Sequence, residues 1–360
     1  MEQNRILTVN QGLELAIGHF QRGEFEPVER ICRDILTGNP DCSSAWHLLG
    51  LVVWQHDNRG EAIQMLRRAI ALDPASPDYF FNIGLMLGGT GCYDEAEEAI
   101  GQSRKLRPAY SGFVPSGSSA EQVDRYGCAL IPGVFSQEEI ADLRNFMADV
   151  AESGSSGWAA DHTSNALERS PELRWVVTHP GLLRIVREAV GETYVLMTAD
   201  FEYEKNAYTG WHTDVASLPN AGRTYHLGPQ YLIVTTLIYL QDNHPVYGGG
   251  MDVLLGSHKT KESEFKTSEL PYYIPHRTGD VVILDSRALH RATPKLFHRP
   301  GMADKCFISI RWGRDRGYAS LCLDHYNSRP DYVARNIRSQ NAPDLEDYLT
   351  AAGVNHLGNS

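Results

Sequence analysis

Two short motifs contain residue types that could bind one metal ion together. A histidine and an aspartate lie two residues apart, as His212 and Asp214, and a second histidine, His290, follows 78 residues after the first. On an extended strand, residues i and i+2 point to the same side, so His212 and Asp214 could grip one ion. Two imidazoles and one carboxylate on one face of an octahedral ion leave three adjacent positions open. Non-haem Fe(II) oxygenases use this arrangement to hold a chelating co-substrate beside O₂.

The spacing alone does not separate this set from a chance arrangement. The sequence has 14 histidines, so a His-x-Asp pair is expected by chance. A lone histidine is more often a satisfied surface or core residue than a ligand. The competing carboxylates and imidazoles are Asp252, Asp285, His226, His244, His258 and His298. The choice among them depends on the elements that surround the motifs.

The first third of the chain contains an internal repeat of 34 residues. Pro40, Pro74 and Pro108 recur at this period. The pattern predicts two amphipathic helices per repeat, with small residues such as Gly50 and Ala62 where the helices cross and a proline that ends the second helix. These features resemble the tetratricopeptide repeat family. The repeats span residues 8–40, which is a looser copy, 41–74 and 75–108.

A Ser-, Gly- and Pro-rich stretch at 111–122 predicts a linker between a first domain, 1–110, and a second domain, 123–345. In the second domain, Ser136 and Glu139 form a capping box that predicts a helix over 137–152. A second helix is predicted over 180–190 and strands over 193–205, 230–241, 250–255, 279–285 and 305–312. Short strands after a few helices favour an α+β domain built on a barrel or a jelly roll.

The order of these segments resembles the phytanoyl-CoA dioxygenase-like family of Fe(II)/2-oxoglutarate oxygenases over about residues 122–340. The His-x-Asp motif, a long strand ending at Tyr239, three glycines from Gly248, then His290 and a last strand follow in the order of that family. The resemblance implies a double-stranded β-helix with Fe(II) between its two sheets, and 2-oxoglutarate and O₂ as co-substrates. The iron ligands that it implies are His212, Asp214 and His290. The predicted fold class is therefore an all-α tetratricopeptide-repeat solenoid followed by an α+β double-stranded β-helix (jelly-roll) domain.

The position of the co-substrate anchor departs from that family. The family normally has an arginine at the start of the last strand, and the matching residue here is Lys305, which offers a point charge instead of a planar fork. Arg311 has the same strand parity and is also expected to face inward. We therefore assign 2-oxoglutarate binding to Lys305 or Arg311, with Arg299 as a third candidate. Because related halogenases lack the carboxylate that Asp214 supplies, the resemblance favours hydroxylation or desaturation over halogenation.

Composition excludes several other classes of protein. The 360 residues carry 33 basic and 45 acidic side chains, a net charge of −12, which argues against nucleic acid as the main partner. The longest apolar runs are too short for a membrane helix, and the N-terminal residues do not resemble a secretory signal. These features predict a cytoplasmic protein without a membrane partner. The six cysteines show no C-x-x-C spacing, and we assign them no function.

The substrate and the role of the repeats stay open at this point. The substrate could be a small molecule or a group bound to a carrier or protein, and the insert 218–228 is expected over the pocket mouth. The repeats could bind a protein or peptide, mediate self-association, or only pack on the second domain. A non-catalytic scaffold and a metal-dependent isomerase or hydrolase are the rival interpretations. Succinate formation from 2-oxoglutarate would separate them.

Overall fold

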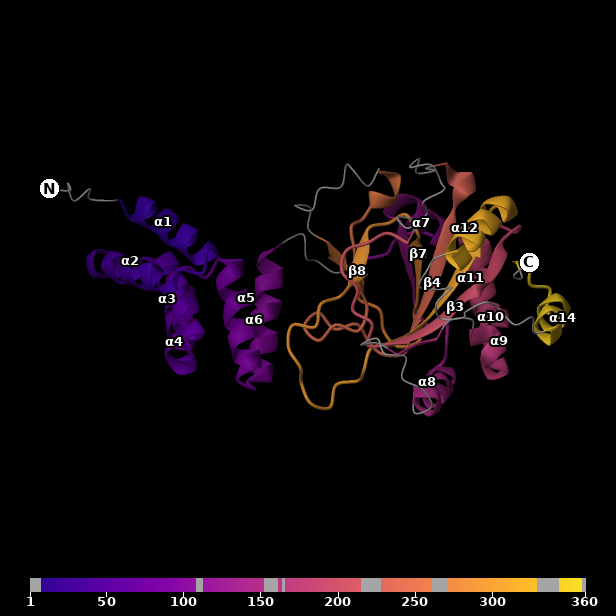
Figure 1. Ribbon diagram of the computed structural model, residues 1–360, viewed down its shortest axis with the longest axis horizontal. Coiled ribbons are helices and arrows are strands. Elements are labelled where there is room, and N and C mark those ends of the chain that lie inside the picture. Colours follow the sequence, from indigo (N-terminus) through magenta and orange to yellow (C-terminus); the bar gives the residue numbers. More distant parts are fainter. Residues whose placement is uncertain are drawn as a thin grey trace. The chain divides into compact units, whose positions relative to one another are not determined.

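The computed structural model describes residues 8–107, 113–151, 161–163, 166–214, 228–260, 271–328 and 343–357. The chain divides into two compact units, drawn in Figure 1. The first unit comprises Met1–Ser111 and Leu296–Gly301, and the second comprises Gly112–Lys295 and Met302–Ser360. Within the described residues, every helix is too short or too polar to span a membrane.

The first unit consists of antiparallel helical pairs, as the 34-residue period predicted. The pairs are α1 (Val9–Gln21) with α2 (Phe25–Gly38), α3 (Ser43–Gln55) with α4 (Arg59–Leu72), and α5 (Pro77–Gly89) with α6 (Tyr93–Leu106). Pro40 and Pro74 each come two residues after the second helix of a pair has ended. Pro108 lies outside the described residues.

Close approach of the paired helices explains the glycines of the repeat. A Cβ atom on Gly50 would lie 2.3 Å from Cδ1 of Leu66, and one on Gly84 would lie 2.7 Å from Cδ1 of Ile100. Both distances are shorter than van der Waals contact, so a larger residue would force the helices apart. The looser first repeat has Ala16 at this position, and Ala16 is fully buried.

Residues 296–301 complete the first unit. The ring of Phe297 lies against Gly88, where a Cβ atom would be 2.4 Å from Cδ1 of the ring, and stacks on Tyr93 with ring centroids 6.1 Å apart. Arg299 forms ion pairs with Glu97 (2.5 Å) and Asp94 (3.2 Å). Arg299, the third candidate for the co-substrate anchor, is thus held by carboxylates of α6.

The second unit is built on two β-sheets, which form the predicted double-stranded β-helix. The larger sheet has the strand order β1-β7-β4-β9-β3-β10, with β2 paired to β3, and the smaller has the order β6-β5-β8. Every pairing is antiparallel except that of β10 with β3. The strands are β1 (Cys128–Ile131), β2 (Asp161–Thr163), β3 (Val195–Lys205), β4 (Ile233–Tyr239), β5 (Met251–Val253), β6 (Tyr272–Tyr273), β7 (Val281–Asp285), β8 (His290–Ala292), β9 (Cys306–Gly313) and β10 (His356–Leu357).

The larger sheet is apolar on its outer face and more polar on its inner face. On β9, Ile308, Ile310 and Trp312 belong to the main hydrophobic core, which they share with helices on the outer side. The alternate residues Ser309 and Arg311 line a cavity between the sheets. Side chains of α7 (Ser119–Tyr126), α8 (Gln137–Ala151), α9 (Ala166–Arg169), α10 (Arg174–Thr178), α11 (Pro180–Val190) and α14 (Pro343–Ala351) join that core, and α12 (Arg316–Ser328) contributes to a smaller one.

Local capping signals place the helices of this unit. The backbone N–H of Glu139 donates to Oγ of Ser136, and the Glu139 carboxylate accepts from the Ser136 N–H at 2.7 Å, so the predicted capping box of α8 is confirmed. Helix α11 ends at Val190, just before Gly191, as predicted. A second capping box, formed by Ser118 and Glu121, starts α7 inside the stretch that we had predicted as linker.

Candidate metal centre

The two candidate histidine ligands are brought together by a backbone bridge. His290 is the first residue of β8, and His212 pairs with it through reciprocal N–H···O hydrogen bonds of 2.9 and 3.0 Å. Their ring centroids lie 4.1 Å apart. The extended strand that we expected for 212–214 is only this single bridge, because the chain turns at Asp214. That turn directs the aspartate back toward the histidines.

The potential ligand atoms converge on one point. Oδ1 of Asp214 lies 3.7 Å from Nε2 of His212 and 3.8 Å from Nε2 of His290. One ligand atom from each residue falls within 4.8 Å of the other two, and no other such group of three occurs in the described ranges. The structure therefore brings together the three residues that the sequence singled out.

Backbone carbonyls orient both imidazoles. Nδ1 of His212 lies 2.8 Å from the carbonyl oxygen of Gly210, and Nδ1 of His290 lies 3.0 Å from that of Ala288. A carbonyl accepts only, so each Nδ1 carries a proton, and Nε2 is the atom of each ring that is placed to bind a metal ion. Burial lowers the pKa of His290 to about 4 in spite of the nearby Asp214, so this ring is neutral at physiological pH.

The second oxygen of Asp214 is held by two other side chains. The Thr235 hydroxyl donates to Oδ2 at 3.2 Å, and Nη2 of Arg311 lies 3.5 Å from the same atom. Burial alone would raise the pKa of Asp214, but Arg311, both histidines and Thr235 hold it below its usual value. The carboxylate is thus ionised and fixed, with Oδ1 directed at the histidines. Strand parity on β4 was the one sequence signal that could have found Thr235.

These donors fit an iron(II) ion that keeps open coordination positions. Two neutral imidazole nitrogens and one carboxylate oxygen form the facial set that leaves sites for a chelating ligand. The triad lines a cavity that is open to solvent. Its other lining residues are Glu202, Glu204, Ala207, Thr209, Thr235, Leu237, Tyr239, Met251, Leu284, Arg291, Ala292, Lys305, Phe307, Ser309 and Arg311.

The two predicted anchor residues line this cavity at different places. Nζ of Lys305 donates to the carbonyl of Ala207 at 2.7 Å and lies 4.8 Å from the centre of the Phe307 ring. Burial lowers the pKa of Lys305 to about 8, although Glu204 opposes the shift. Arg311 lies six positions after Lys305, so their Cα atoms are roughly 20 Å apart on an extended strand. Arg311 contacts the Asp214 carboxylate, whereas Lys305 forms no ion pair with it.

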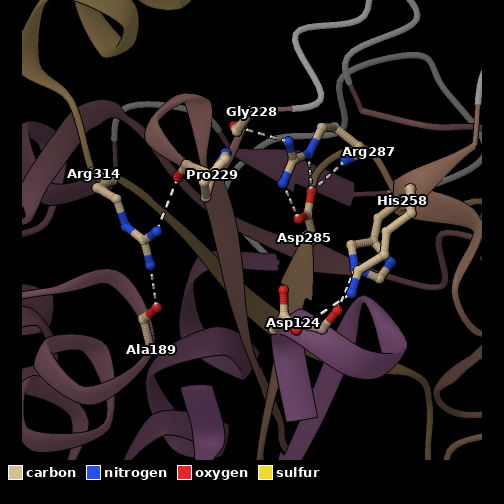
Figure 2. Close-up of polar contacts among 9 residues, drawn as sticks. Asp124, Ala189, Gly228, Pro229, His258, Asp285, Arg287 and Arg314 are labelled. Atoms are coloured by element: carbon tan, nitrogen blue, oxygen red, sulfur yellow. Dashed lines mark hydrogen bonds and ion pairs between the residues drawn. The ribbon is translucent and has the colours of Figure 1, made fainter. Parts of the chain in front are cut away.

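The competing carboxylates, Asp285 and Asp252, form ion pairs with neighbouring arginines. Asp285 accepts bonds of 2.9 and 2.6 Å from Arg287, as Figure 2 shows. Asp252 accepts from Arg291 at 2.9 Å and from the Thr293 hydroxyl at 3.0 Å. Both carboxylates are thus committed to neighbouring side chains.

The competing histidines in the described residues contact other parts of the chain. Nε2 of His258 is bonded to the Asp124 carbonyl at 2.9 Å (Figure 2), and Nδ1 of His244 accepts from the backbone of Val246 at 3.1 Å. His298 belongs to the segment that packs in the first unit. His226 lies outside the described residues.

Two arginines fix the chain at the end of the predicted insert. Residues 218–227 lie outside the described residues, but the carbonyls of Gly228 and Pro229 accept from Arg287 (3.4 Å) and Arg314 (2.9 Å). Arg314 also donates to the carbonyl of Ala189 at the end of α11, at 3.1 Å (Figure 2). The point where the insert rejoins β4 is therefore tied to the scaffold.

Parts of this chain match a known protein family and a known protein. Residues 123–296 match the sequence profile of the phytanoyl-CoA dioxygenase (PhyH) family. That match includes His212, Asp214 and His290 and ends before Lys305. The chain is also 30% identical over 99 residues to the peroxisomal targeting signal receptor of Candida glabrata, which covers 27% of this chain and 17% of the receptor. The chain therefore spans less than a fifth of the length of that curated relative.

Two solved structures are similar to parts of this chain. One is the epimerase SnoN in complex with Fe3+, alpha ketoglutarate and nogalamycin RO, which is 21% identical, covers 56% of this chain and 87% of that chain, and has a TM-score of 0.44. The other is HygX from Streptomyces hygroscopicus with nickel and 2-oxoglutarate bound, which is 20% identical, covers 56% and 89% of the two chains, and has a TM-score of 0.42.

Proposed function

We propose that this chain, which carries a phytanoyl-CoA dioxygenase family domain over residues 123–296, is an Fe(II)- and 2-oxoglutarate-dependent dioxygenase that hydroxylates an unactivated C–H bond. The observation that carries the proposal is the convergence of Nε2 of His212, Oδ1 of Asp214 and Nε2 of His290 on one point beside an open cavity. The overall reaction would convert substrate, 2-oxoglutarate and O₂ into hydroxylated substrate, succinate and CO₂. The substrate would be a small molecule or a group on a carrier or protein.

The triad would hold iron without rearranging. Nε2 of each imidazole already faces Oδ1 of Asp214, while Gly210 and Ala288 accept the Nδ1 protons. Thr235 and Arg311 bind the far oxygen of Asp214, which keeps the near oxygen turned toward the metal position. Bound Fe(II) with 2-oxoglutarate supplies the oxidising chemistry. The chain's part is to fix the ligand geometry and to enclose the reacting groups.

Lys305 is the better candidate for the distal carboxylate of 2-oxoglutarate. Arg311 already lies against the ligand Asp214, so we assign it to positioning that carboxylate. Lys305 is 4% exposed and lines the same cavity without an ion pair to Asp214. A buried ammonium that lacks water gains strongly from a carboxylate partner.

The proposal is tested by following conversion of 2-oxoglutarate to succinate with Fe(II) and O₂, alone and with amino acids, acyl thioesters and carrier-bound groups. We expect iron-dependent succinate formation that at least one substrate class stimulates, and a substrate product heavier by one oxygen. A chain that binds neither iron nor 2-oxoglutarate would instead be a non-catalytic scaffold. A product isomerised without succinate formation would favour the isomerase interpretation.

We also propose that the repeats dock a partner or a second subunit and perform no chemistry. A jelly roll has its own core and does not need helical pairs to fold, which favours a separate role for them. We expect residues 115–360 to turn over 2-oxoglutarate but to lose efficiency with the physiological substrate, or to lose self-association. Equal efficiency and an equal oligomeric state in the truncated and complete chains would remove this docking role.

A further inference from the structure

The third helical pair lacks an aromatic side chain that the first two pairs carry at the same position of the repeat. Phe20 of α1 and Trp54 of α3 are 34 residues apart, and the next position at this period is Gly88 of α5. The ring centroids of Phe20 and Phe25 lie 5.7 Å apart, and the guanidinium carbon of Arg59 lies 5.7 Å from the centre of the Trp54 ring. The first two pairs therefore have an aromatic contact across the turn between their helices, and Gly88 cannot supply one.

A ring from outside the repeats takes this place in the third pair. A Cβ atom on Gly88 would lie 2.4 Å from Cδ1 of Phe297, so the ring fills the space where a side chain at position 88 would begin. The same ring stacks on Tyr93, five positions after Gly88, with centroids 6.1 Å apart and an interplanar angle of 21°. Phe297 thus makes the contact that aromatic residues of the first two pairs make within their own repeats. Gly88 and Tyr93 form a notch, the aromatic notch, that accepts a ring from another segment.

Two carboxylates beside the aromatic notch bind an arginine. Nη1 of Arg299 lies 2.5 Å from Glu97, and Nη2 lies 3.2 Å from Asp94. The guanidinium carbon also lies 5.7 Å from the centre of the Tyr93 ring, which is within the range of a cation–π contact. Asp94 is in the first turn of α6, where the helix dipole favours a carboxylate whether or not an arginine is bound. Asp94 and Glu97, the acidic pair, therefore complement a basic side chain that lies two positions after the ring.

The segment that fills this site binds as an extended peptide. Residues 296–301 are all described, and their backbone forms neither a helix nor a strand. Phe297 and Arg299 are half-buried, whereas His298 and Pro300 are exposed. In an extended chain, alternate side chains point to the same side. The recognised feature is thus an aromatic residue followed by an arginine two positions later.

Few contacts hold this segment in place. The Arg299 side chain is 35% exposed, and ion pairs as open to water as this contribute little free energy. Lys295 and Met302, on either side of the segment, are exposed. A tethered segment has a high effective concentration, so weak contacts suffice to keep it bound until a ligand with more contacts replaces it.

We propose that the aromatic notch and the acidic pair form a recognition site for a partner protein whose extended segment carries an aromatic residue followed, two positions later, by an arginine. Residues 296–301 fill this site in the same chain and compete with that partner. The inference names the partner of the docking role that we proposed for the repeats, and it rests on that role. The glycine at position 88 supplies the space, and Asp94 and Glu97 supply the charge.

The experiment measures binding of a fluorescein-labelled peptide with the sequence of residues 294–303 to the full chain by fluorescence anisotropy. The double variant Phe297→Ala/Arg299→Ala, the emptied chain, removes the internal competitor. It should bind the peptide at least about tenfold more tightly than the unchanged chain, because the tethered segment no longer occupies the site. A peptide with alanine in place of its phenylalanine should bind the emptied chain about tenfold or more weakly, because no ring fills the aromatic notch.

Further substitutions in the emptied chain locate the binding site. Gly88→Phe restores the aromatic residue of the first two pairs, so it should fill the notch and abolish peptide binding. Glu97→Gln should weaken binding by about two- to fivefold, as for a partly exposed ion pair. Glu95→Gln is the matched control, because Glu95 lies in the same helix but pairs with Arg67 at 2.8 Å, and it should leave the Kd unchanged. If Gly88→Phe does not fold, the comparison of Glu97→Gln with Glu95→Gln still decides.

Two results would overturn the inference. The first is a peptide that binds the emptied chain no better than the unchanged chain, or binds it equally well after Gly88→Phe and Glu97→Gln. The second is an unchanged chain that sediments as a dimer and an emptied chain that sediments as a monomer, because the occupant would then be a second copy. Neither measurement needs iron or turnover, and the docking role itself is tested by the truncated chain. A failure here is therefore distinct from a failure of the proposed function.

Discussion

His47 in the repeats is half-buried and His290 in the jelly roll is buried, and burial lowers the pKa of each to about 4. Their surroundings differ. Nε2 of His47 lies 2.8 Å from the side-chain amide of Asn82, and its ring packs against Tyr79. Nε2 of His290 faces a carboxylate that a second imidazole also faces. Burial and a shifted pKa therefore do not identify a ligand histidine, whereas convergence of several donors does.

The largest difference between the two units is expected in 2-oxoglutarate turnover, when His290 or His47 is replaced by alanine. His290→Ala should reduce 2-oxoglutarate turnover below detection while the thermal unfolding temperature changes by only a few degrees, because a ligand is lost from a built cavity. His47→Ala should leave turnover intact and destabilise only the helical pairs. Normal succinate production by His290→Ala would remove the triad assignment. The assay is succinate formation, with Mn(II) binding as a second readout.

The next effect concerns two basic residues, Lys305 just before β9 and Arg311 within it. Lys305→Met should raise the KM for 2-oxoglutarate by a factor that corresponds to about 2–4 kcal/mol of lost binding free energy, as when a buried charge loses its partner. Arg311→Met should act mainly on metal affinity, because Arg311 contacts Asp214. Lys259→Met, an exposed lysine paired with Asp124, is the control and should change neither value. An unchanged KM in Lys305→Met would move the anchor elsewhere in the cavity.

Packing of the repeats can be disturbed without touching the metal centre. Gly50→Ala places a Cβ atom 2.3 Å from Leu66 and should destabilise the first unit by about 1–3 kcal/mol. Gly101→Ala, at a helical position with nothing within 4 Å, should stabilise it by about 0.5–1 kcal/mol. Urea unfolding followed by circular dichroism measures both changes. Equal effects of the two substitutions would contradict the close helix crossing.

The smallest effect is a pH dependence of co-substrate binding. Lys305 loses its proton as pH rises through about 8, and the neutral amine cannot pair with a carboxylate. The KM for 2-oxoglutarate should therefore be constant below pH 8 and about tenfold higher at pH 9, a change of about 1.4 kcal/mol. Lys305→Arg keeps its charge and should flatten the profile. An identical rise in that variant would show that another group titrates.

Patterns of regular spacing predicted most of the fold. The 34-residue period gave the helical pairs, the Ser136–Glu139 capping box gave the start of α8, and strand-like runs between turn-rich connections gave β3, β4, β7 and β9. The strands of the smaller sheet were harder, because β6 and β8 are only two and three residues long. A strand of two or three residues is too short to show an alternation of apolar and polar residues. Its position depends on pairing with strands that are far away in the sequence.

The site residues also fall into two groups. Local sequence features identified some of them, and others depend on contacts between segments that are far apart in the sequence. The candidate triad followed from residue types, spacing and a resemblance to a family. Lys305 and Arg311, which share one strand parity, both line the cavity. Thr235 was missed, because its contact with Asp214 joins segments that are far apart in the sequence. Arg299 could not be dismissed from sequence, since the contacts of residues 296–301 with α6 have no local signal.

The most direct test of the central claim is a crystal structure of the full chain with Fe(II) and 2-oxoglutarate, grown without oxygen and measured at the iron absorption edge. We predict one strong anomalous peak bonded to Nε2 of His212, Oδ1 of Asp214 and Nε2 of His290, with 2-oxoglutarate chelating it and its distal carboxylate at Lys305. An iron peak that lacks any of these three ligands, or that lies at Asp252 or Asp285, would contradict the account.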